Sequence, residues 1–337
     1  MNYQANEKDI LIIEAFPGLP VNNRQATIKG LEDVNNPLVP AVDDSYVFNK
    51  DLVTDLRSLY LKPFSEGLCI FGHSGTGKTS GVLQFMARLN RPVRSISCSG
   101  RMTADDFIGF HALKSERPGE APVMKFNYGP LPLAMQEGSC LLINEIDMVD
   151  PSELMALKDV LEGRPLIIAS NGGEIIHPHP DFRIIVTANT VGSGDETGLY
   201  QGARMQNLAF MDCFRFSEVH YLDKDSELAI LNKVIPTLPL PIKTGMVEVA
   251  NGIRSLFMGD ENHGGTISVP LTTRVLIRWA KLLTQYRGAD KPLEISFQKA
   301  FLLKVNPAEK ETITRVCRDV FGNNWDTPFS SFGATPK

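Results

Sequence analysis

An eight-residue loop in the first quarter of the chain constrains the fold more than any other feature. Residues 72–79 read GHSGTGKT and fit the pattern G-x-x-x-x-G-K-[ST] at every fixed position. A short apolar segment, residues 67–71, precedes the loop, and a segment with helical spacing follows it. Strand, glycine-rich loop and helix in this order predict a phosphate-binding loop, where main-chain N–H groups and the helix N-terminus face the phosphates.

The residues of this loop have separate expected roles. Those expected to bind ATP are Gly72, Ser74, Gly75, Thr76, Gly77, Lys78 and Thr79. Lys78 would contact the β- and γ-phosphates, and the Thr79 hydroxyl would be a ligand of Mg²⁺. The alternative is a chance glycine-rich turn, which the flanking strand and helix argue against.

The segments around the loop predict an α/β fold. Short apolar stretches alternate with helical ones from about residue 46, which indicates a parallel sheet covered by helices on both faces. The stretches expected to be strands are residues 67–71, 92–100, 139–147 and 182–190.

After about residue 222 the chain shows only helical periodicity. We therefore predict a P-loop NTPase core followed by a smaller all-helical lid domain. The expected divisions are an N-terminal arm and linker over 1–45, the nucleotide-binding domain over 46–222, the lid over 223–322 and a loose tail over 323–337.

The apolar stretch CLLINE, residues 140–145, has the pattern of a Walker B strand. Such strands normally end in Asp-Glu, where the Asp holds the Mg²⁺ shell and the Glu orients the attacking water. Here Asn144 takes the first position, and its side-chain oxygen can accept a hydrogen bond but carries no charge. Glu145 keeps the second position and is the candidate for activating water. Asp147, one turn further on, is a candidate to supply the missing charge. The alternative for Glu145 is a helix cap.

Two further polar residues are candidates for contacts to the nucleotide. Asn189 ends the stretch FRIIVTANT, where its amide can reach the γ-phosphate or the water; the alternative is an Asx turn that ends the strand. Arg274 follows Thr272 and Thr273, either of which can cap a helix that presents the arginine to the nucleotide. Arg278, one turn later, competes for this role, and a solvated helix arginine is the alternative.

The overall composition excludes several classes of protein. The 337 residues carry a net charge of −5 and are 43% hydrophobic, a mix typical of globular proteins. The negative charge, with no basic stretch interleaved with aromatics, makes nucleic acid an unexpected partner. No apolar run approaches the roughly 20 residues that span a bilayer, and the first residues do not resemble a secretory signal. Five scattered cysteines without CxxC spacing indicate reduced thiols, so we expect a cytoplasmic protein without membrane contact.

With these motifs in order, the chain resembles the MoxR-type branch of the AAA+ ATPases, and within it the small ATPase subunit of aerobic cobaltochelatase. The resemblance runs from about Pro40 to Phe321. It is carried by residues 40–48, by residues 177–212 with the specific segment GSGDETGLYQG, and by residues 300–311. It implies that Asn189 is the sensor 1 residue and that Arg274 is the sensor 2 residue.

The resemblance also implies an assembly. Members of this branch form homo-oligomeric rings, usually hexamers, with nucleotide at the subunit interfaces and an arginine supplied by the neighbouring subunit. Two β-hairpins are expected, around residues 106–128 and 165–180, and they would line the ring and touch partners. A typical partner contains a von Willebrand A-type domain, and in cobaltochelatase the ring assists insertion of Co²⁺ into a corrin.

Two departures from the family pattern stand out. The family usually has an acid where this chain has Asn144, and an arginine directly after the Met-Asp pair where this chain has Cys213. The residues that could act in place of that arginine are Arg215, two positions later, and Arg204.

Three functions follow as hypotheses. The first is an ATPase that remodels a partner protein in a chaperone-like manner. The second is a nucleotide-gated scaffold, because Asn144 and Cys213 could together leave a ring that binds ATP and scarcely hydrolyses it. The third is a nucleic-acid motor such as a helicase loader, which the charge disfavours.

Overall fold

The computed structural model describes residues 6–20, 23–32, 35–115, 121–195, 200, 202–259 and 265–329. The chain divides into two compact units, the first formed mainly by residues up to Val219 and the second mainly by the chain from His220 onward. Five of the eleven residues of the segment GSGDETGLYQG, 196–199 and 201, lie outside the described residues.

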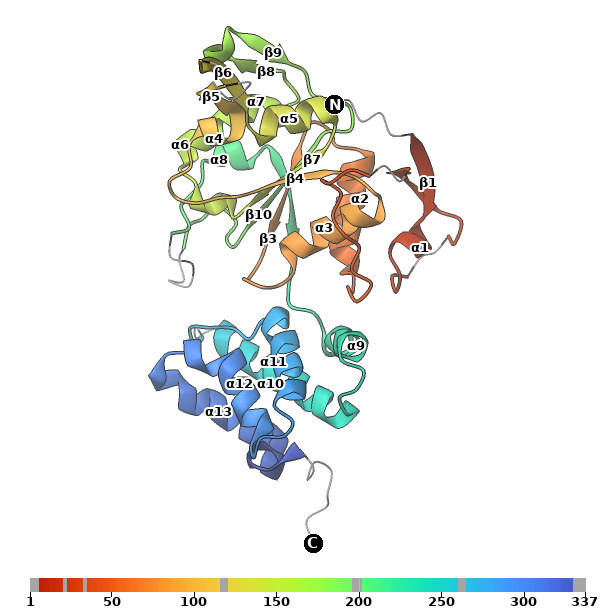
Figure 1. Cartoon of the computed structure of the whole chain (residues 1–337), viewed down its shortest axis with the longest axis vertical. Coiled ribbons are helices and arrows are strands. Elements are labelled where there is room, and N and C mark those ends of the chain that lie inside the picture. The colour runs from red at the N-terminus through yellow and green to blue at the C-terminus, as the bar shows by residue number, and fades with distance from the viewer. Residues whose placement is uncertain are drawn as a thin grey trace. The chain divides into compact units, whose positions relative to one another are not determined.

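A five-stranded parallel sheet forms the centre of the first unit (Figure 1). Its strand order is β11-β3-β10-β7-β4, so the strand before the phosphate-binding loop lies beside the one that ends at Asn189. The strands are β3 (Gly67–Phe71), β4 (Val93–Ser97), β7 (Cys140–Asn144), β10 (Arg183–Ala188) and β11 (Phe214–Glu218). The three inner strands are buried along almost their whole length, which explains their continuous apolar sequences.

The predicted α/β class is confirmed, and the sheet has one strand more than the sequence suggested. β11 was not predicted because only Phe214 and Ser217 are buried in it, so the segment has no continuous apolar run. It pairs on one side only, with β3, as an edge strand does.

The helices of the first unit cover this sheet. Helix α2 packs beside α3, and α5 packs against β4 and β7 (Figure 1). The helices are α1 (Ile12–Ala15), α2 (Lys50–Leu61), α3 (Lys78–Arg88), α4 (Ala104–Ile108), α5 (Pro130–Glu137), α6 (Pro151–Leu154), α7 (Lys158–Leu161) and α8 (Leu208–Met211), with 3₁₀ turns at Ile146–Met148, Met155–Leu157 and Ala169–Asn171.

Three small antiparallel hairpins accompany the sheet. They are β1 (Glu7–Leu11) with β2 (Thr27–Leu31), β5 (Gly109–Lys114) with β6 (Val123–Tyr128), and β8 (Leu166–Ile168) with β9 (Glu174–Ile176). The last two confirm the hairpins expected around residues 106–128 and 165–180. The Tyr128 hydroxyl donates to the Glu174 carboxylate at 2.8 Å, which ties these two hairpins together.

The N-terminal arm packs on the core. Phe16, which follows α1, is fully buried and stacks on Phe85 of α3 with 5.1 Å between ring centroids. The main-chain N–H of Leu31 donates to the carbonyl of Leu89 at 2.9 Å, directly after α3. These contacts hold the arm against the helix that begins at Lys78.

Among its described residues the second unit contains helices and connecting loops but no strand, as predicted. Its helices are α9 (Lys224–Val234), α10 (Leu240–Met258), α11 (Thr273–Gln285), α12 (Pro292–Ala300) and α13 (Pro307–Phe321), with 3₁₀ turns at Leu302–Lys304 and Gly322–Asp326. Trp279 and Phe297 meet at 4.6 Å in its core. A fully buried ion pair joins Glu227 of α9 to Arg254 of α10 at 2.7 Å.

Candidate functional site

The phosphate-binding loop leaves β3 at Phe71 and enters α3 at Lys78. Gly72 has φ +141°, and a Cβ at this position would collide with the carbonyl oxygen of Val219. Gly77, directly before the helix, has φ +96°, a backbone conformation that residues other than glycine rarely adopt. The glycines of the motif are therefore required by local geometry, and the free N–H groups of the first turn of α3 open toward the loop.

The side chain of Lys78 folds over this loop. It is 9% exposed, and its Nζ donates to the carbonyls of Gly72 and His73 at 2.6 and 3.0 Å and to Asn189 Oδ1 at 3.1 Å. Burial lowers the pKa of Lys78 to about 8, while the charges of Asp147 and Glu145 act in the opposite direction. A buried ammonium group with only neutral hydrogen-bond acceptors gains most from an anion such as phosphate.

Thr79 and Asn144, the two residues expected to bind magnesium, lie in direct contact. The Thr79 hydroxyl donates to Asn144 Oδ1 at 2.7 Å. The other half of the Asn144 amide is held by β4, because its Nδ2 donates to Ser95 Oγ at 2.9 Å and to the carbonyl of Ile96 at 3.4 Å. The amide oxygen is thus fixed on the side of the phosphate-binding loop. Mg²⁺ is a hard cation that prefers oxygen ligands, and these two neutral oxygen atoms lie side by side.

Glu145 occupies the turn that follows β7. Its φ of +58° and ψ of +46° place it in the left-handed region, which costs a non-glycine residue roughly 1–3 kcal/mol. Its N–H donates to Thr187 Oγ1 at 3.2 Å, and the residue itself is exposed. Such strain is typical of functional positions, and here it turns the carboxylate away from the apolar interior.

Asp147 lies in the same turn and reaches the end of the neighbouring strand. Its Oδ2 accepts hydrogen bonds from the main-chain N–H groups of Asn189 and Thr190 at 2.8 and 3.3 Å. The sequence singled out Asp147 for its charge, and this contact to the strand end was not predicted. The polar residues Ser95 and Thr187 were missed as well; their only signal was a polar residue within an apolar strand.

A histidine of the phosphate-binding loop has a partner far along the chain. His73 Nδ1 lies 2.7 Å from the hydroxyl of Tyr200, and the two rings are stacked with centroids 6.3 Å apart. The N–H of Tyr200 donates to Asp195 at 2.8 Å. The segment that the family resemblance marked as specific therefore contacts the phosphate-binding loop directly.

The two arginines considered for action on a neighbouring subunit have different surroundings. Arg215 lies on β11 opposite Leu68, near the start of β3, and its guanidinium contacts Glu66 and the carbonyls of Lys62 and Pro63. The Arg204 side chain is 42% exposed and pairs with one exposed carboxylate, Asp150, at 2.6 Å.

Cys213 does not occupy a surface position. It is 8% exposed within the main apolar cluster of the first unit, and its thiol lies 3.5 Å from the carbonyl of Ala209. An arginine at this position would have to leave that cluster to reach a phosphate.

The second unit contains the remaining candidate residues. Arg274 and Arg278 are both exposed on α11, in its first and second turns. The helix is capped by Thr272, whose hydroxyl accepts from the N–H of Val275 at 3.3 Å. Thr273 instead donates to Glu227 at 2.7 Å, so it links the start of α11 to the buried ion pair.

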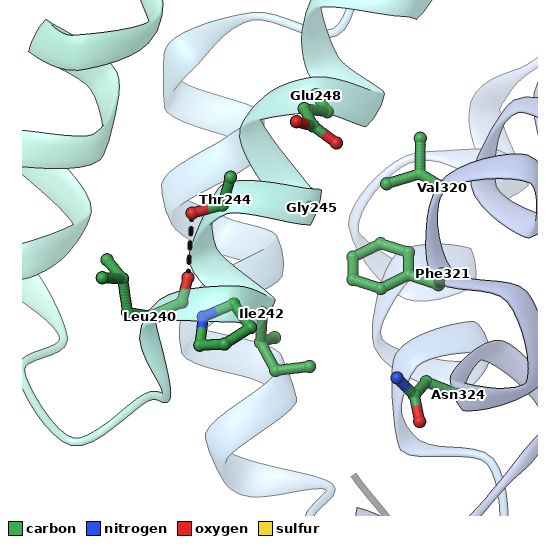
Figure 2. A pocket seen from close by; sticks show the side chains of 9 residues that line it. Leu240, Ile242, Thr244, Gly245, Glu248, Val320, Phe321 and Asn324 are labelled. Atoms are coloured by element: carbon green, nitrogen blue, oxygen red, sulfur yellow. Dashed lines mark hydrogen bonds between the residues drawn. The ribbon is translucent and has the colours of Figure 1, made fainter. Parts of the chain in front are cut away.

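A hollow of about 430 Å³ opens between α10 and α13 (Figure 2). Its lining is mainly apolar; Phe321 lies across from Gly245 and Ile242, and Val320 lies across from Glu248 (Figure 2). No residue of the phosphate-binding loop lines it, so it is separate from the nucleotide-binding candidates.

In the part of the chain that the structure describes, no helix combines the length and the apolar character that crossing a bilayer requires.

Comparison with known proteins finds two family matches in succession. Residues 67–201 match the AAA domain of the dynein-related subfamily, and residues 227–320 match the CbbQ/NirQ/NorQ C-terminal family. The first match begins at β3 and the second lies within the helical unit.

Among individual proteins, the chain is similar to aerobic cobaltochelatase subunit CobS of a Sinorhizobium species, with 29% identity over 84% of this chain and 83% of that protein. It is 32% identical to an uncharacterized protein of Staphylococcus saprophyticus, over 57% of this chain and 65% of the relative. A mutant RuvB of Thermotoga maritima superposes with a TM-score of 0.48 at 13% identity, over 84% and 74% of the two chains, a likeness too weak to support any conclusion.

Proposed function

Because the chain belongs to the MoxR-type branch of the AAA+ ATPases, close to CobS, we propose that it binds ATP with Mg²⁺ and hydrolyses it to drive a change in a partner protein. In this proposal residues 46–222 are the motor domain and residues 223–322 are its lid. The protein acts in the cytoplasm.

One contact supports this proposal above all others. The Thr79 hydroxyl and the Asn144 amide oxygen, 65 residues apart in sequence, meet at 2.7 Å. A P-loop NTPase needs these two positions together, because residues at both would hold the metal ion that binds with the nucleotide. This contact supports the proposed role of Asn144 in holding the metal, even though the residue carries no charge.

The residues would divide the work of hydrolysis as follows. The main chain of residues 72–77 and the first turn of α3 would bind the phosphates, and Lys78 would exchange its three neutral acceptors for phosphate oxygens. Thr79 and Asn144 would hold Mg²⁺, directly or through its water, and the ion supplies positive charge against the developing phosphate charge. Glu145 would orient the attacking water and accept its proton, with Asn189 as sensor 1 and Arg274 as sensor 2.

The direct test is Mg²⁺-dependent release of phosphate from ATP by the purified chain. We expect Lys78→Ala to abolish both binding and turnover. Glu145→Gln, which keeps size and polarity, should abolish turnover and leave binding in place. Turnover that survives both substitutions would show that another site, or a contaminant, performs the hydrolysis.

We further propose that the chain assembles into a homo-oligomeric ring, a hexamer as in its family, with an arginine acting in trans. Arg215 and Arg204 are the candidates. Their contacts favour Arg204, because Arg215 is held by several groups of its own chain whereas Arg204 has one exposed carboxylate as partner. Light scattering in the presence of ATP tests the ring. Mixing each Arg→Ala variant with a Glu145→Gln subunit tests the arginine, since only an arginine that acts in trans restores activity in such a mixture.

The proposed partner is a protein with a von Willebrand A-type domain, and the two hairpins are the proposed contact region. They present exposed apolar side chains, among them Phe110, Leu113, Met124 and Ile167. Metal insertion, the activity that the name of CobS states for its complex, is one candidate for the process served. Co-purification with a protein of that class from the source cell tests this point.

The second candidate, a nucleotide-gated scaffold with scarce turnover, has one observation in its favour. The Asn144 Nδ2 donates hydrogen bonds to Ser95 and Ile96, which an aspartate could not do. The surroundings of this residue therefore favour the uncharged amide. Asn144→Asp distinguishes the two functions. A large gain in turnover supports the scaffold, and little change supports a native motor.

A further inference from the structure

Asp147 is a buried carboxylate between the two elements that carry Glu145 and Asn189. The residue is 1% exposed and sits in the 3₁₀ turn Ile146–Met148, directly after Glu145. Its Oδ2 accepts from the N–H groups of Asn189 and Thr190, at the end of β10.

The sheet itself does not hold this strand end on the side of β7. The β7–β10 pairing ends at Val186 opposite Ile143, whereas β10 continues beside β3 as far as Ala188 opposite Phe71. The next two N–H groups, of Asn189 and Thr190, turn to the Asp147 carboxylate. The Asp147 side chain therefore accepts the hydrogen bonds of this strand end where pairing with β7 has stopped.

The same residue has a second tie through its main chain. The carbonyl of Asp147 accepts from the N–H of Arg204 at 2.7 Å. Asp147 Oδ1, by contrast, is buried and has no hydrogen-bond partner among the described residues. An incompletely paired buried carboxylate costs free energy, which argues that the contact of Asp147 to the end of β10 has a role beyond stability.

We propose that Asp147 is a positioning residue for hydrolysis, which holds the main chain at Asn189 and so fixes the Asn189 amide relative to Glu145 and the phosphate-binding loop. The N–H of Asn189 is held by Asp147 at 2.8 Å, and the Asn189 Oδ1 lies 3.1 Å from Lys78 Nζ. This inference rests on the proposed ATPase function and adds a residue to it. Asp147 itself touches no substrate.

A double-mutant cycle tests the proposal. The variants are Asp147→Ala, which removes the acceptor, Asn189→Ala and the double variant, with Asp159→Ala as the control, since Asp159 is an exposed acid that pairs with Arg164. For each variant kcat and KM are measured for ATP, together with the affinity for a fluorescent ATP analogue and the melting temperature.

We expect Asp147→Ala to lower kcat about tenfold or more, the usual result of a small misplacement in an active site. KM and analogue affinity should change less than about twofold, because the phosphate-binding loop is untouched. In the Asn189→Ala background the same substitution should have no further effect on kcat, since both act through one amide. Asp159→Ala should behave as the wild type.

Multiplicative effects of the two substitutions on kcat would overturn the proposal, as would an unchanged kcat in Asp147→Ala. If Asp147→Ala melts below the assay temperature, Asp147→Ser carries the same cycle, because its shorter side chain does not reach both N–H groups. A wild-type chain without ATPase activity would refute the proposed function itself. An active wild type with independent effects would refute the role of Asp147 alone.

Discussion

Lys78 Nζ and Asn189 Oδ1 lie 3.1 Å apart although 111 residues separate them in the chain. The contact exists because β3 and β10 are neighbours in the parallel sheet, so the loop after one strand meets the residue after the other. Open parallel sheets place their ligand-binding loops at this edge. The ammonium group, the amide and the Thr79–Asn144 pair together form the candidate nucleotide site.

Asn144→Asp changes the charge beside Thr79. The substitution removes the Nδ2 donor to Ser95 and Ile96 and brings a carboxylate close to the Ile96 carbonyl, so we expect a loss of about 1–2 kcal/mol in the free energy of unfolding. The added charge should lower the Mg²⁺ concentration that half-saturates nucleotide binding. If the native protein already hydrolyses ATP efficiently, as proposed, turnover should rise less than about threefold at saturating Mg²⁺. Restoring a missing catalytic group would instead raise turnover by about 10²-fold or more. Urea denaturation and Mg²⁺ titrations measure these effects, with Ser95→Ala as the control that removes one hydrogen bond and adds no charge.

Cys213→Arg introduces a charge into the apolar cluster of the first unit. The side chain at this position is 8% exposed, so an arginine must either be buried or displace α8 and β11. We expect a loss of at least about 2 kcal/mol in the free energy of unfolding, measured by urea denaturation. Cys213→Ala serves as the control and should cost less than the arginine. A stable arginine variant with raised turnover would show instead that the position faces a phosphate.

The Glu227–Arg254 pair anchors the second unit. Both side chains are fully buried, and Arg254 also donates to the carbonyl of Leu271 at 2.7 Å. Removing one partner leaves an uncompensated charge, so Glu227→Gln or Arg254→Met should each cost about 3–5 kcal/mol. Thr273→Val, which removes only a hydroxyl donor to Glu227, should cost about 1 kcal/mol. Chemical denaturation followed by the fluorescence of buried Trp279 and Trp325 reports on this unit. Equal losses in the free energy of unfolding for all three variants would show that breaking the ion pair costs no more than losing one hydrogen bond.

The cysteines should resist alkylation in the native protein. Burial raises the pKa of the thiols of Cys69, Cys98 and Cys140 to about 12. The thiolate is the nucleophile, so at pH 8 only about one such thiol in ten thousand is reactive, and reactivity rises with pH. Mass spectrometry after iodoacetamide treatment at pH 8 should find these residues unmodified without urea and modified in urea. Rapid native labelling of Cys140 would show that β7 is not buried as described.

The sequence was sufficient for the parts of the fold with continuous or periodic patterns. β3, β7 and β10 are buried on both faces, so their apolar runs identify them without further information. β11 escaped prediction because an edge strand needs fewer apolar residues, and Phe214 is followed by the half-buried Arg215.

The site was predictable only where a motif fixes the local spacing. The phosphate-binding loop and Glu145 follow from short patterns, but the clamp by Asp147 depends on where two strands stop pairing. The contacts of Arg215 depend on Glu66, 149 residues away, which no local pattern reveals. Strand register and long-range partners are properties of the folded chain, and a single sequence does not specify them.

The proposed function depends most directly on one equilibrium, the binding of ATP with Mg²⁺ by the loop that ends in Lys78 and Thr79. Isothermal titration of the purified chain with a non-hydrolysable ATP analogue and Mg²⁺ measures it. We expect saturable binding with one site per chain, lost in Lys78→Ala and retained in Glu145→Gln. An intact, folded wild-type chain with no affinity for the analogue, or with affinity unchanged by Lys78→Ala, would contradict the account.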